Sequence, residues 1–469
     1  MRAGRHEGRL LPRGAKGNRS PPARHPKRAA PTPRALWRRA RDPLMVGAGK
    51  AWKGGVVNLI LTNGRVFDGA SEEIAERRFV WIEDGVIREV GDVPPAATRA
   101  EMLDLGGRFL MPGLIDAHFH AYGIEANPAR IDLVPPVLRG LRAKRLLEAA
   151  LQRGFTTVRD AAGADAALAT ALRDGLIEGP RLFYPGLALS QTGGHGDLRS
   201  PDHHDLCACA YCGALTTVVD GPDEMRKAVR EQLRLGAHQI KLFVSGGVLS
   251  PSDPIWMNQF SIEEIRVAVE EAAVRRTYVM AHAHTNEAVL RCVANGVRSI
   301  EHATMIENDG ARAIVEHDAF AVPTLAVGDA IRKLGPELGL SSVMLAKAAE
   351  RGNQAVASID KLRSAGAKIG FGTDLLGPAS TRQSLEFGLR REVLSPIEIL
   401  RSATSVNAAL IGMEGRLGTV APGAFADLIV LDGDPLADVA LFERHEAIRL
   451  IVKDGRIHKN SLPATAAGG

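Results

Sequence analysis

Side chains that can bind a metal ion recur at the points where short apolar runs of the sequence end. The first two, His118 and His120, are two residues apart. Because residues i and i+2 of a β-strand project to the same face, both imidazoles can reach one ion. The other candidates each belong to a separate strand-like run, most of them at its end. We therefore predict one metal site formed by His118, His120, Lys241, His282, His302 and Asp374.

Lys241 is the unusual member of this set, because it lies inside the apolar run 240–244. If Ile240 and Leu242 face outward from a sheet, Lys241 points inward. A buried, unpaired ammonium costs several kcal/mol, so we expect the amine to lose its proton or to find a partner. A neutral amine beside two dications can add carbon dioxide and become a carbamate, which is a bridging carboxylate. Alternatively, the lysine extends along the wall to the mouth of the site.

Two further histidines are predicted to act on a substrate. His284 follows His282 by two residues and therefore lies on the same strand face, further out. His195 lies in a Gly-rich loop, where backbone can approach a ligand closely. Both are assigned as catalytic residues that bind a carbonyl oxygen or a carboxylate of the substrate; the alternative is that they only hydrogen-bond the metal ligands. For Asp160, at another strand end, we expect a salt bridge with a neighbouring arginine.

Strand-like and helix-like patterns alternate through the middle of the chain. Strands are expected at 110–120, 156–161, 181–186, 239–244, 278–283, 299–303, 320–325 and 368–374, and helices at 141–152, 223–235, 261–275, 286–295, 309–317 and 342–365. Eight strand-then-helix units pair in parallel and close into a (β/α)8 TIM barrel, whose active site forms at the carboxyl ends of the strands. A doubly wound sheet is the alternative, but it needs a Gly-rich phosphate turn where this sequence has Ala117-His118-Phe119-His120.

The two ends of this regular part carry hairpin signals instead. Asn-Gly and Asp-Gly pairs between β-branched runs tolerate the positive φ of a type I′ turn. They occur at Asn63-Gly64, Asp84-Gly85, Asp432-Gly433 and Asp454-Gly455. The predicted fold class is therefore α/β, with a barrel over 111–412 and a small β-sandwich domain built from 57–110 and 413–460.

The charge of the chain is unevenly distributed. The 469 residues are 45% hydrophobic and 24% charged, a globular composition that excludes a disordered protein, a collagen and a coiled coil. Residues 1–44 carry a net charge of +11, so the rest of the chain carries −6 of the total of +5. The proline-rich segment 1–56 is interpreted as a disordered extension, translated upstream of a start near Met45; a polyanion-binding arm or a targeting segment is the alternative. Residues 461–469 are expected to form a tail.

Other signals concern the location and the partners of the protein. Arg38-Arg39 resembles a twin-arginine signal, but no apolar core follows it. No stretch approaches 18 consecutive apolar residues, so no membrane span is predicted. Four cysteines do not form a secreted disulfide framework, and a reducing, cytoplasmic location is expected. We also expect a homo-oligomer, with nucleic-acid binding confined at most to the basic extension.

Three of the four cysteines are clustered in one loop between the third and fourth predicted strands. Their types would suit a structural zinc together with His203 and His204, but the spacing lacks paired Cys-x-x-Cys motifs. Reduced thiols on a lid-like loop are the alternative. The cluster consists of Cys207, Cys209 and Cys212, whereas Cys292 lies in a helical pattern and is expected in the core.

Taken together, these residues resemble the amidohydrolase superfamily. Its pattern is His-x-His on strand one, a carboxylated lysine on strand four, histidines on strands five and six, and an aspartate on strand eight, all present here at the six positions given above. The run 415–436 also resembles the segment in which the chain of superfamily members passes from the barrel back into the β-sandwich. The resemblance implies two Zn²⁺ ions, one held by His118, His120 and Asp374 and the other by His282 and His302. Carboxylated Lys241 would bridge the ions, and Asp374 would orient the attacking hydroxide, take its proton and pass it to the leaving amine.

Several segments are similar to the branch of prolidase-type and ochratoxinase-type amidohydrolases. They are TGGHGD at 192–197, QIKLFVSGGV at 239–248, AHAH at 281–284, IEHATMI at 300–306 and VPTLAV at 322–327. This branch implies hydrolysis of an exocyclic amide of dipeptides or N-acyl amino acids, with ochratoxin A cleaved to phenylalanine and ochratoxin alpha as a candidate reaction. A cyclic-amide hydrolase of the imidazolonepropionase or hydantoinase type is the alternative, since the same metals serve both.

Loops after the strands are expected to supply the substrate pocket. The segment 254–257, between the fourth strand and its helix, contains Trp256, and the short loop after His120 contains Tyr122. With Leu325 and Leu375, these residues are predicted to line an apolar pocket for an aromatic or bulky aliphatic group.

Overall fold

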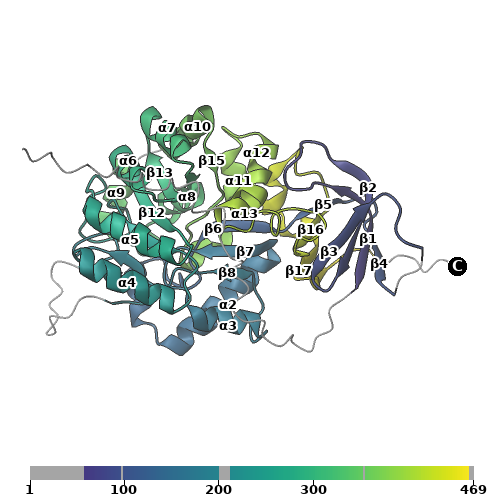
Figure 1. Cartoon of the computed structure of the whole chain (residues 1–469), viewed down its shortest axis with the longest axis horizontal. Helices are drawn as coiled ribbons and strands as arrows, with labels where there is room; N and C mark the ends of the chain where they lie inside the picture. The colour runs from purple at the N-terminus through teal and green to yellow at the C-terminus, as the bar shows by residue number, and fades with distance from the viewer. Residues whose placement is uncertain (1–57, 97–98, 200–211, 352–353, 464–469) are drawn as a thin grey trace, which may run out of the picture.

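The computed structural model describes residues 58–96, 99–199, 212–351 and 354–463. Strands from both ends of this chain lie together at one end of the molecule, and alternating strands and helices form the rest (Figure 1). The basic extension 1–56 and the predicted zinc-type residues His203, His204, Cys207 and Cys209 lie outside the described residues. Within them, no helix has the length and the apolar character needed to cross a membrane.

Eight strands from the two chain ends form one mixed sheet. Their order is β18-β17-β16-β5-β1-β2-β3, with β4 beside β1. Side chains such as Leu59, Val80, Leu428 and Val452 are fully buried in one shared apolar cluster, which draws these distant segments together. The strands are β1 (Leu59–Val66), β2 (Ala75–Glu83), β3 (Val86–Gly91), β4 (Glu101–Asp104), β5 (Phe109–Pro112), β16 (Leu428–Leu431), β17 (Ile448–Lys453) and β18 (Arg456–Asn460).

The strands of the middle segment form two parallel sheets, ordered β6-β7-β8 and β10-β9-β11-β12-β13-β14-β15. Backbone hydrogen bonds connect the two sheets on both sides. His238 N donates to Tyr184 O at 2.8 Å on one side, and on the other Ala117 N donates to Phe371 O and Asp374 N to His118 O, both at 2.8 Å. The strands are β6 (Leu114–Phe119), β7 (Phe155–Asp160), β8 (Arg181–Phe183), β9 (Ala188–Ser190), β10 (Thr216–Val218), β11 (Ile240–Phe243), β12 (Val279–Thr285), β13 (Ser299–Met305), β14 (Phe320–Val322) and β15 (Lys368–Ile369).

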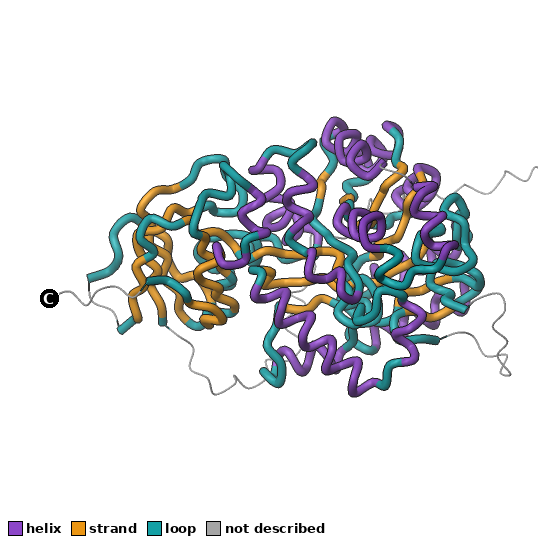
Figure 2. Tube along the Cα trace, turned by 180° about the vertical axis from the view of Figure 1, so that it is seen from behind, coloured by secondary structure: helices purple, strands orange, loops and turns teal. Residues whose placement is uncertain are grey.

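Helices flank the strands of the middle segment (Figure 2). Local signals set where several of them begin: Ser261 and Glu264 form a capping box at the start of α5, and the Thr285 hydroxyl caps α6. The helices are α2 (Pro136–Gln152), α3 (Ala166–Arg173), α4 (Pro222–Arg234), α5 (Ile262–Val274), α6 (Asn286–Ala294), α7 (Asn308–Glu316), α8 (Leu325–Leu334), α9 (Ser342–Arg351), α10 (Gln354–Ala365), α11 (Leu385–Arg390), α12 (Pro396–Arg401) and α13 (Asn407–Leu410).

Four of the predicted strands differ from the observed ones. The strands predicted at 181–186 and 368–374 end early, at Phe183 and Ile369, and two others differ in their organisation. The segment 110–120 forms two strands, β5 in the terminal sheet and β6 in a parallel sheet, separated at Gly113. The predicted boundary between 110 and 111 therefore falls inside β5. The segment 320–325 is a strand only as far as Val322, because Pro323 has no N–H to continue the ladder, and α8 begins at Leu325.

Candidate active site

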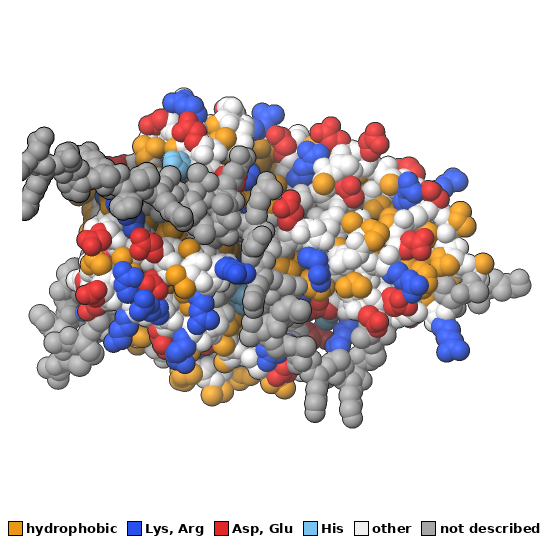
Figure 3. Space-filling view, in the orientation of Figure 1, with side chains coloured by type: hydrophobic (Ala, Val, Ile, Leu, Met, Phe, Trp, Pro, Cys, Tyr) orange, Lys and Arg blue, Asp and Glu red, His pale blue; other side chains and the backbone are white. Residues whose placement is uncertain are grey.

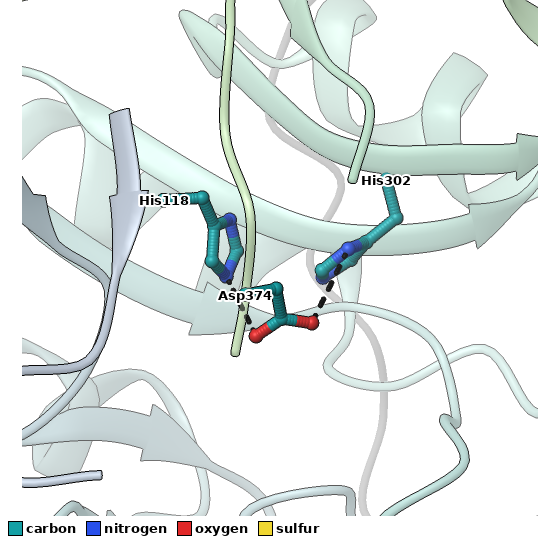
Figure 4. Close-up of side chains that lie close together, drawn as sticks. All are labelled: His118, His302 and Asp374. Atoms are coloured by element: carbon teal, nitrogen blue, oxygen red, sulfur yellow. Dashed lines mark ion pairs between the residues drawn. The ribbon is translucent and has the colours of Figure 1, made fainter. Parts of the chain in front are cut away.

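Three predicted metal ligands form a tight cluster at the carboxyl ends of their strands. Each of His118 (β6), His302 (β13) and Asp374 (after β15) offers a ligand atom within 4.8 Å of the others. In Figure 4 the carboxylate of Asp374 lies between the two imidazoles. Its Oδ1 is 3.4 Å from His118 Nε2 and its Oδ2 is 3.8 Å from His302 Nδ1. His120 joins the cluster, with its Nε2 2.9 Å from the same Oδ1.

The two remaining candidates lie on neighbouring strands of the same sheet. The His282 ring, on β12, has its centroid 4.6 Å from that of His302. Lys241, on β11, is paired in register with Met280 of β12 and is 2% exposed. All six predicted metal ligands line one cavity.

The protonation states of the cluster suit metal binding. Burial holds the pKa values of His282 and His302 well below the ordinary value of 6.5, so both rings are neutral near pH 7. Neutral imidazole is the form that coordinates metal. For Asp374, burial acts to raise the pKa, but His118, His120 and His302 outweigh it and hold the pKa well below 3.8. His282 and His302 thus offer neutral nitrogen donors beside an ionised carboxylate. For His118, burial acts to lower the pKa, but Asp374 and Glu301 outweigh burial and raise the pKa above 6.5, so this ring would release a proton when it binds a metal ion.

Burial also changes the chemistry of Lys241. It lowers the pKa of this amine from 10.5 to about 8, although Glu301 and Asp374 act in the opposite direction. The Nζ atom lies over the Phe243 ring, 5.3 Å from its centroid. Lys241 forms no ion pair with any of the described residues. Because the pKa of its amine is about 8, a substantial fraction of the amine is neutral near pH 8.

A buried ion pair that the sequence analysis missed orients His118. Glu301 accepts a hydrogen bond at 2.7 Å from His118 Nδ1, which turns Nε2 toward Asp374. Arg159 donates to both oxygens of Glu301, at 2.9 and 3.0 Å. Such a carboxylate behind a ligating histidine fixes its tautomer and ring plane. The available signal was a charged residue inside an apolar strand run, the same signal that identified Lys241.

The expected salt bridge of Asp160 is replaced by backbone contacts. Its carboxylate accepts hydrogen bonds from the backbone N–H groups of Ala121, Ala162 and Ala164, at 2.7, 2.9 and 3.1 Å. The neighbouring arginine, Arg159, is engaged with Glu301 instead. Burial raises the pKa of Asp160 to about 6. This residue therefore organises the loop after β7.

Two residues of the cluster have a left-handed backbone conformation. His302 has φ of 70° and Asp374 has φ of 58°. Left-handed backbone at residues with a Cβ costs of order 1–3 kcal/mol and persists where the surroundings hold it, often at functional sites. Both side chains are thereby directed to the cavity (Figure 4).

The residues present fit a metal site. The His120 Nδ1 atom is buried and has no hydrogen-bond partner among the described residues. Buried polar atoms are normally paired, and this ring presents its other nitrogen, Nε2, to the Asp374 carboxylate, so its polar atoms are free to take part in binding a ligand. Together with the neutral rings and the ionised Asp374, it forms a set of donors that could hold a divalent ion.

His195 and His284 lie against the rings of His282 and His302. The His195 ring stacks on His282, with centroids 4.4 Å apart, and the His284 ring stacks on His302, at 4.9 Å. The Nδ1 atom of His284 is 3.1 Å from the Thr304 hydroxyl. Both histidines line the cavity, as a substrate-binding role requires.

The apolar wall of the cavity differs from the predicted one. Tyr122, Trp256, Leu325 and Leu375 are not among the described residues that line it, and Trp256 is 68% exposed. Leu376 lines the cavity in place of Leu375, and Val327 and Ile331 of α8 line it in place of Leu325. The cavity has a volume of about 750 Å³ counted out to its open mouth, and its apolar lining is Pro128, Ala162, Leu198, Leu215, Phe243, Val248, Leu249, Val327, Ile331 and Leu376.

The described cysteines do not add to this site. Cys212 is exposed and forms an isolated β-bridge with Thr217. Cys292 is fully buried in the core, as its helical pattern predicts, and burial raises its pKa to about 12. The question of a third metal involves Cys207 and Cys209, which lie outside the described residues.

An α/β protein with imidazoles and a carboxylate gathered at the carboxyl ends of parallel strands has the architecture of a metal-dependent hydrolase. The amidohydrolase family model matches residues 109–458, and the chain belongs to this family. It is a hydrolase acting on amide C–N bonds.

Relatives of known structure or name place the chain more closely within the family. Ochratoxinase from Aspergillus niger is 32% identical over 85% of this chain and 86% of its own length. The crystal structure of that ochratoxinase has a TM-score of 0.75 at 30% identity and covers 86% of this chain and 96% of its own. A prolidase in complex with N-methylphosphonate-L-proline has a TM-score of 0.83 at 44% identity, covering 86% of this chain and 99% of its own.

Proposed function

We propose that this protein is a binuclear zinc enzyme that hydrolyses the exocyclic amide bond of N-acyl amino acids or dipeptides. The observation that carries the proposal is the single cavity in which six candidate ligands face an apolar wall. The similarity to an ochratoxinase and to a prolidase supports this class of substrate. Ochratoxin A, with its amide link to phenylalanine, is the candidate substrate we would test first.

We further propose that the parallel strands form a closed (β/α)8 barrel in the order β6-β7-β8-β11-β12-β13-β14-β15, in which β9 continues the line of β8 and pairs with β11. The hydrogen bonds from His238 to Tyr184 and from Ala117 to Phe371 support closure, because they join the neighbouring ends of the two sheets. The terminal sheet would fold over its own apolar cluster as a β-sandwich. Hydrogen bonds between Ile87 and the segment 423–424 support this, because they bring β3 to the chain before β16.

The proposed ligands fall into two groups. His118, His120 and Asp374 would hold one ion, and His282 and His302 the other. Lys241 would bridge them as a carbamate, for which its burial and lowered pKa are suitable, because carbon dioxide adds to the neutral amine. When bound, the two ions lower the pKa of a shared water molecule and polarise the scissile carbonyl.

The chain's own groups would move the protons. Asp374 is ionised and its two oxygens face His118 and His302. Its carboxylate would take the proton of the attacking water and deliver it to the nitrogen of the leaving amine. His195 stacks on His282 and His284 stacks on His302. Both would hydrogen-bond the carbonyl or the carboxylate of the substrate.

The apolar wall would select the substrate and exclude water. Val248, Leu249, Val327 and Ile331 present aliphatic surface to the same cavity as the histidines. Burying an aromatic or aliphatic group there stabilises the complex by about 25 cal/mol per Å² of apolar area. A dry site also strengthens the hydrogen bonds that the histidines make to the substrate.

The test is a comparison of exocyclic with cyclic amides. Zinc-loaded protein is assayed against a panel of N-acyl amino acids, ochratoxin A included, and against hydantoins and cyclic imides. We expect higher kcat/KM for exocyclic amides with apolar groups, and loss of this activity in Asp374→Asn. A higher kcat/KM for the cyclic amides would contradict the proposal and favour a cyclic-amide hydrolase.

A further inference from the structure

A buried polar cluster lies against the Nδ1 side of the His195 ring. It consists of Ser250, Asp253 and Gln259 from the segment after β11, and Lys347 from α9. All four side chains are buried, although each carries a charge or a polar group. Burying such groups is costly unless each is hydrogen-bonded, so the cluster requires a structural or functional reason.

The cluster contacts both the ring and the backbone of His195. The Nδ1 atom is 2.8 Å from Ser250 Oγ and 3.3 Å from Asp253 Oδ2. The backbone N–H donates to Gln259 Oε1 at 2.9 Å. Gly247 packs on the ring, because a Cβ there would lie only 2.3 Å from His195 Cε1. The ring is therefore confined between this loop and the His282 ring on which it stacks.

The hydrogen bonds of Ser250 determine where the ring proton lies. Lys347 Nζ, which can only donate, is 3.0 Å from Ser250 Oγ, and the Ser250 hydroxyl itself donates to Gly247 O at 3.3 Å. With its own proton directed to Gly247 O, Ser250 accepts a proton from His195 Nδ1. The ionised Asp253 can also only accept. Both neighbours thus favour a proton on Nδ1 and leave Nε2 for the cavity.

Lys347 holds the carboxylate and the loop in place. Its Nζ donates to the backbone oxygens of Ser250 and Asp253, at 2.9 and 2.7 Å, and lies 3.5 Å from Asp253 Oδ1. The other carboxylate oxygen, Oδ2, accepts from Gly247 N at 3.0 Å and from Gln259 Nε2 at 3.2 Å. One helical turn before Lys347, Met344 packs in the apolar cluster that includes the cavity-lining residues Val248 and Val327. Helix α9 therefore supports the histidine and the cavity wall together.

We propose that Asp253 and Lys347 are positioning residues for His195. They fix the plane of the imidazole and keep its proton on Nδ1, so that Nε2 faces the cavity to hydrogen-bond the substrate. The inference rests on the proposed function only in the role of His195 toward the substrate. The geometry of the cluster stands independently of which amide is cleaved.

The first test reads the tautomer without any substrate. Metal-free protein labelled with 15N-histidine is studied by NMR at a pH about two units above the ordinary histidine pKa of about 6.5. The signals of His195 are assigned as those that disappear in His195→Gln. We expect a proton on Nδ1 in the wild type and its loss in Asp253→Asn, whose amide can donate to the ring. A wild-type ring protonated on Nε2 would overturn the proposal.

The second test separates positioning from a general effect on structure. In the zinc-loaded enzyme we expect Asp253→Asn and Lys347→Met each to lower kcat/KM by roughly 10–100-fold, the usual effect of a small displacement in an active site. In the His195→Ala background the same changes should have almost no further effect, because they act through that ring. An equal loss in both backgrounds would overturn the proposal.

Controls keep the two tests interpretable. Lys333→Met, on the exposed surface of the neighbouring helix α8, removes a lysine without touching the cluster and should leave both readouts unchanged. Thermal unfolding shows which variants retain the fold, and if Lys347→Met does not fold, the tautomer in the wild type still decides. If no amide were cleaved at all, the proposed function would fail while the tautomer result would still test the cluster.

Discussion

At the scale of single residues, Lys241 has the most unusual environment in the site. It is an amine among imidazoles and carboxylates, 2% exposed, with its pKa lowered to about 8. The cost of keeping an ammonium there lowers the pKa, so more of the amine is in the neutral form, which is the one that can react with carbon dioxide. Its proposed role as a bridge therefore follows from burial rather than from charge attraction.

Replacing Lys241 tests that bridge. We predict that Lys241→Ala lowers the metal content and kcat together, because both ions lose a shared ligand. Metal analysis by mass spectrometry and a steady-state assay measure the two quantities. Lys144→Ala, on the surface of α2, is the matched control. Two bound zinc ions and an unchanged kcat in Lys241→Ala would rule out the bridging role.

Glu301 shows how a buried charge can be stabilised. Burial alone would raise its pKa, but Arg159 and His118 outweigh burial and lower it to about 2. A carboxyl group whose pKa is lower in the folded than in the unfolded protein stabilises the fold above its ordinary pKa of about 4.5. That contribution is lost as the pH falls from about 4.5 to 2.

The acid stability of a Glu301 variant tests this balance. For metal-free Glu301→Gln we predict a loss of about 3–5 kcal/mol at neutral pH, because Arg159 is left buried and unpaired. We also predict that the wild type loses about 3 kcal/mol more than this variant between about pH 4.5 and 2. Urea unfolding at several pH values measures both, with the exposed Glu287→Gln as control. Parallel pH profiles for wild type and Glu301→Gln would refute the assignment.

At the scale of elements, Gly113 is the point where the chain passes from the terminal sheet into the parallel sheets. Its neighbour in space is Thr156 at the start of β7, whose Oγ1 would lie 2.1 Å from a Cβ at position 113. Gly113 N also donates to Asp427 O at 2.8 Å. This hydrogen bond connects the residue before β6 with the residue before β16. These close contacts fix the position of β6, and therefore of His118, relative to β7 and the terminal sheet.

Filling this contact should shift β6 and weaken the fold. We predict that Gly113→Ala destabilises the protein by about 1–3 kcal/mol, the usual cost of overpacking a core. Truncating the neighbour in Gly113→Ala/Thr156→Ala should recover part of the loss, since two of the three clashing atoms are removed. Thermal or urea unfolding provides the measurement. A double variant less stable than the sum of the two single changes would contradict this explanation.

At the scale of the whole molecule, the folded part and the basic segment 1–44 differ in how their charge is distributed. On the face drawn in Figure 3, Lys and Arg side chains are interspersed with Asp and Glu among the described residues. The strong positive charge of the chain is carried by residues 1–44. Long-range attraction of a polyanion would therefore be a property of that segment rather than of the hydrolase.

The same scale separates what could be predicted from sequence from what could not. Strand ends and same-face spacing are local properties, and they were enough to find His118, His120 and Asp374 as neighbours. Glu301 could be noticed as a charged residue inside an apolar run. Its pairing with Arg159 depends on which strands are neighbours in the sheet, and no local sequence pattern specifies that. Trp256 was misplaced because a loop sequence specifies side chains without their directions.

Metal dependence of amide hydrolysis is the most direct test of the whole account. Purified protein is stripped with a chelator, reloaded with zinc in the presence of bicarbonate, and assayed with the best N-acyl amino acid of the panel, while bound zinc is counted. We predict that activity disappears with the metal, returns on reloading and saturates at two zinc ions per chain. Full activity in protein that retains no metal would contradict it.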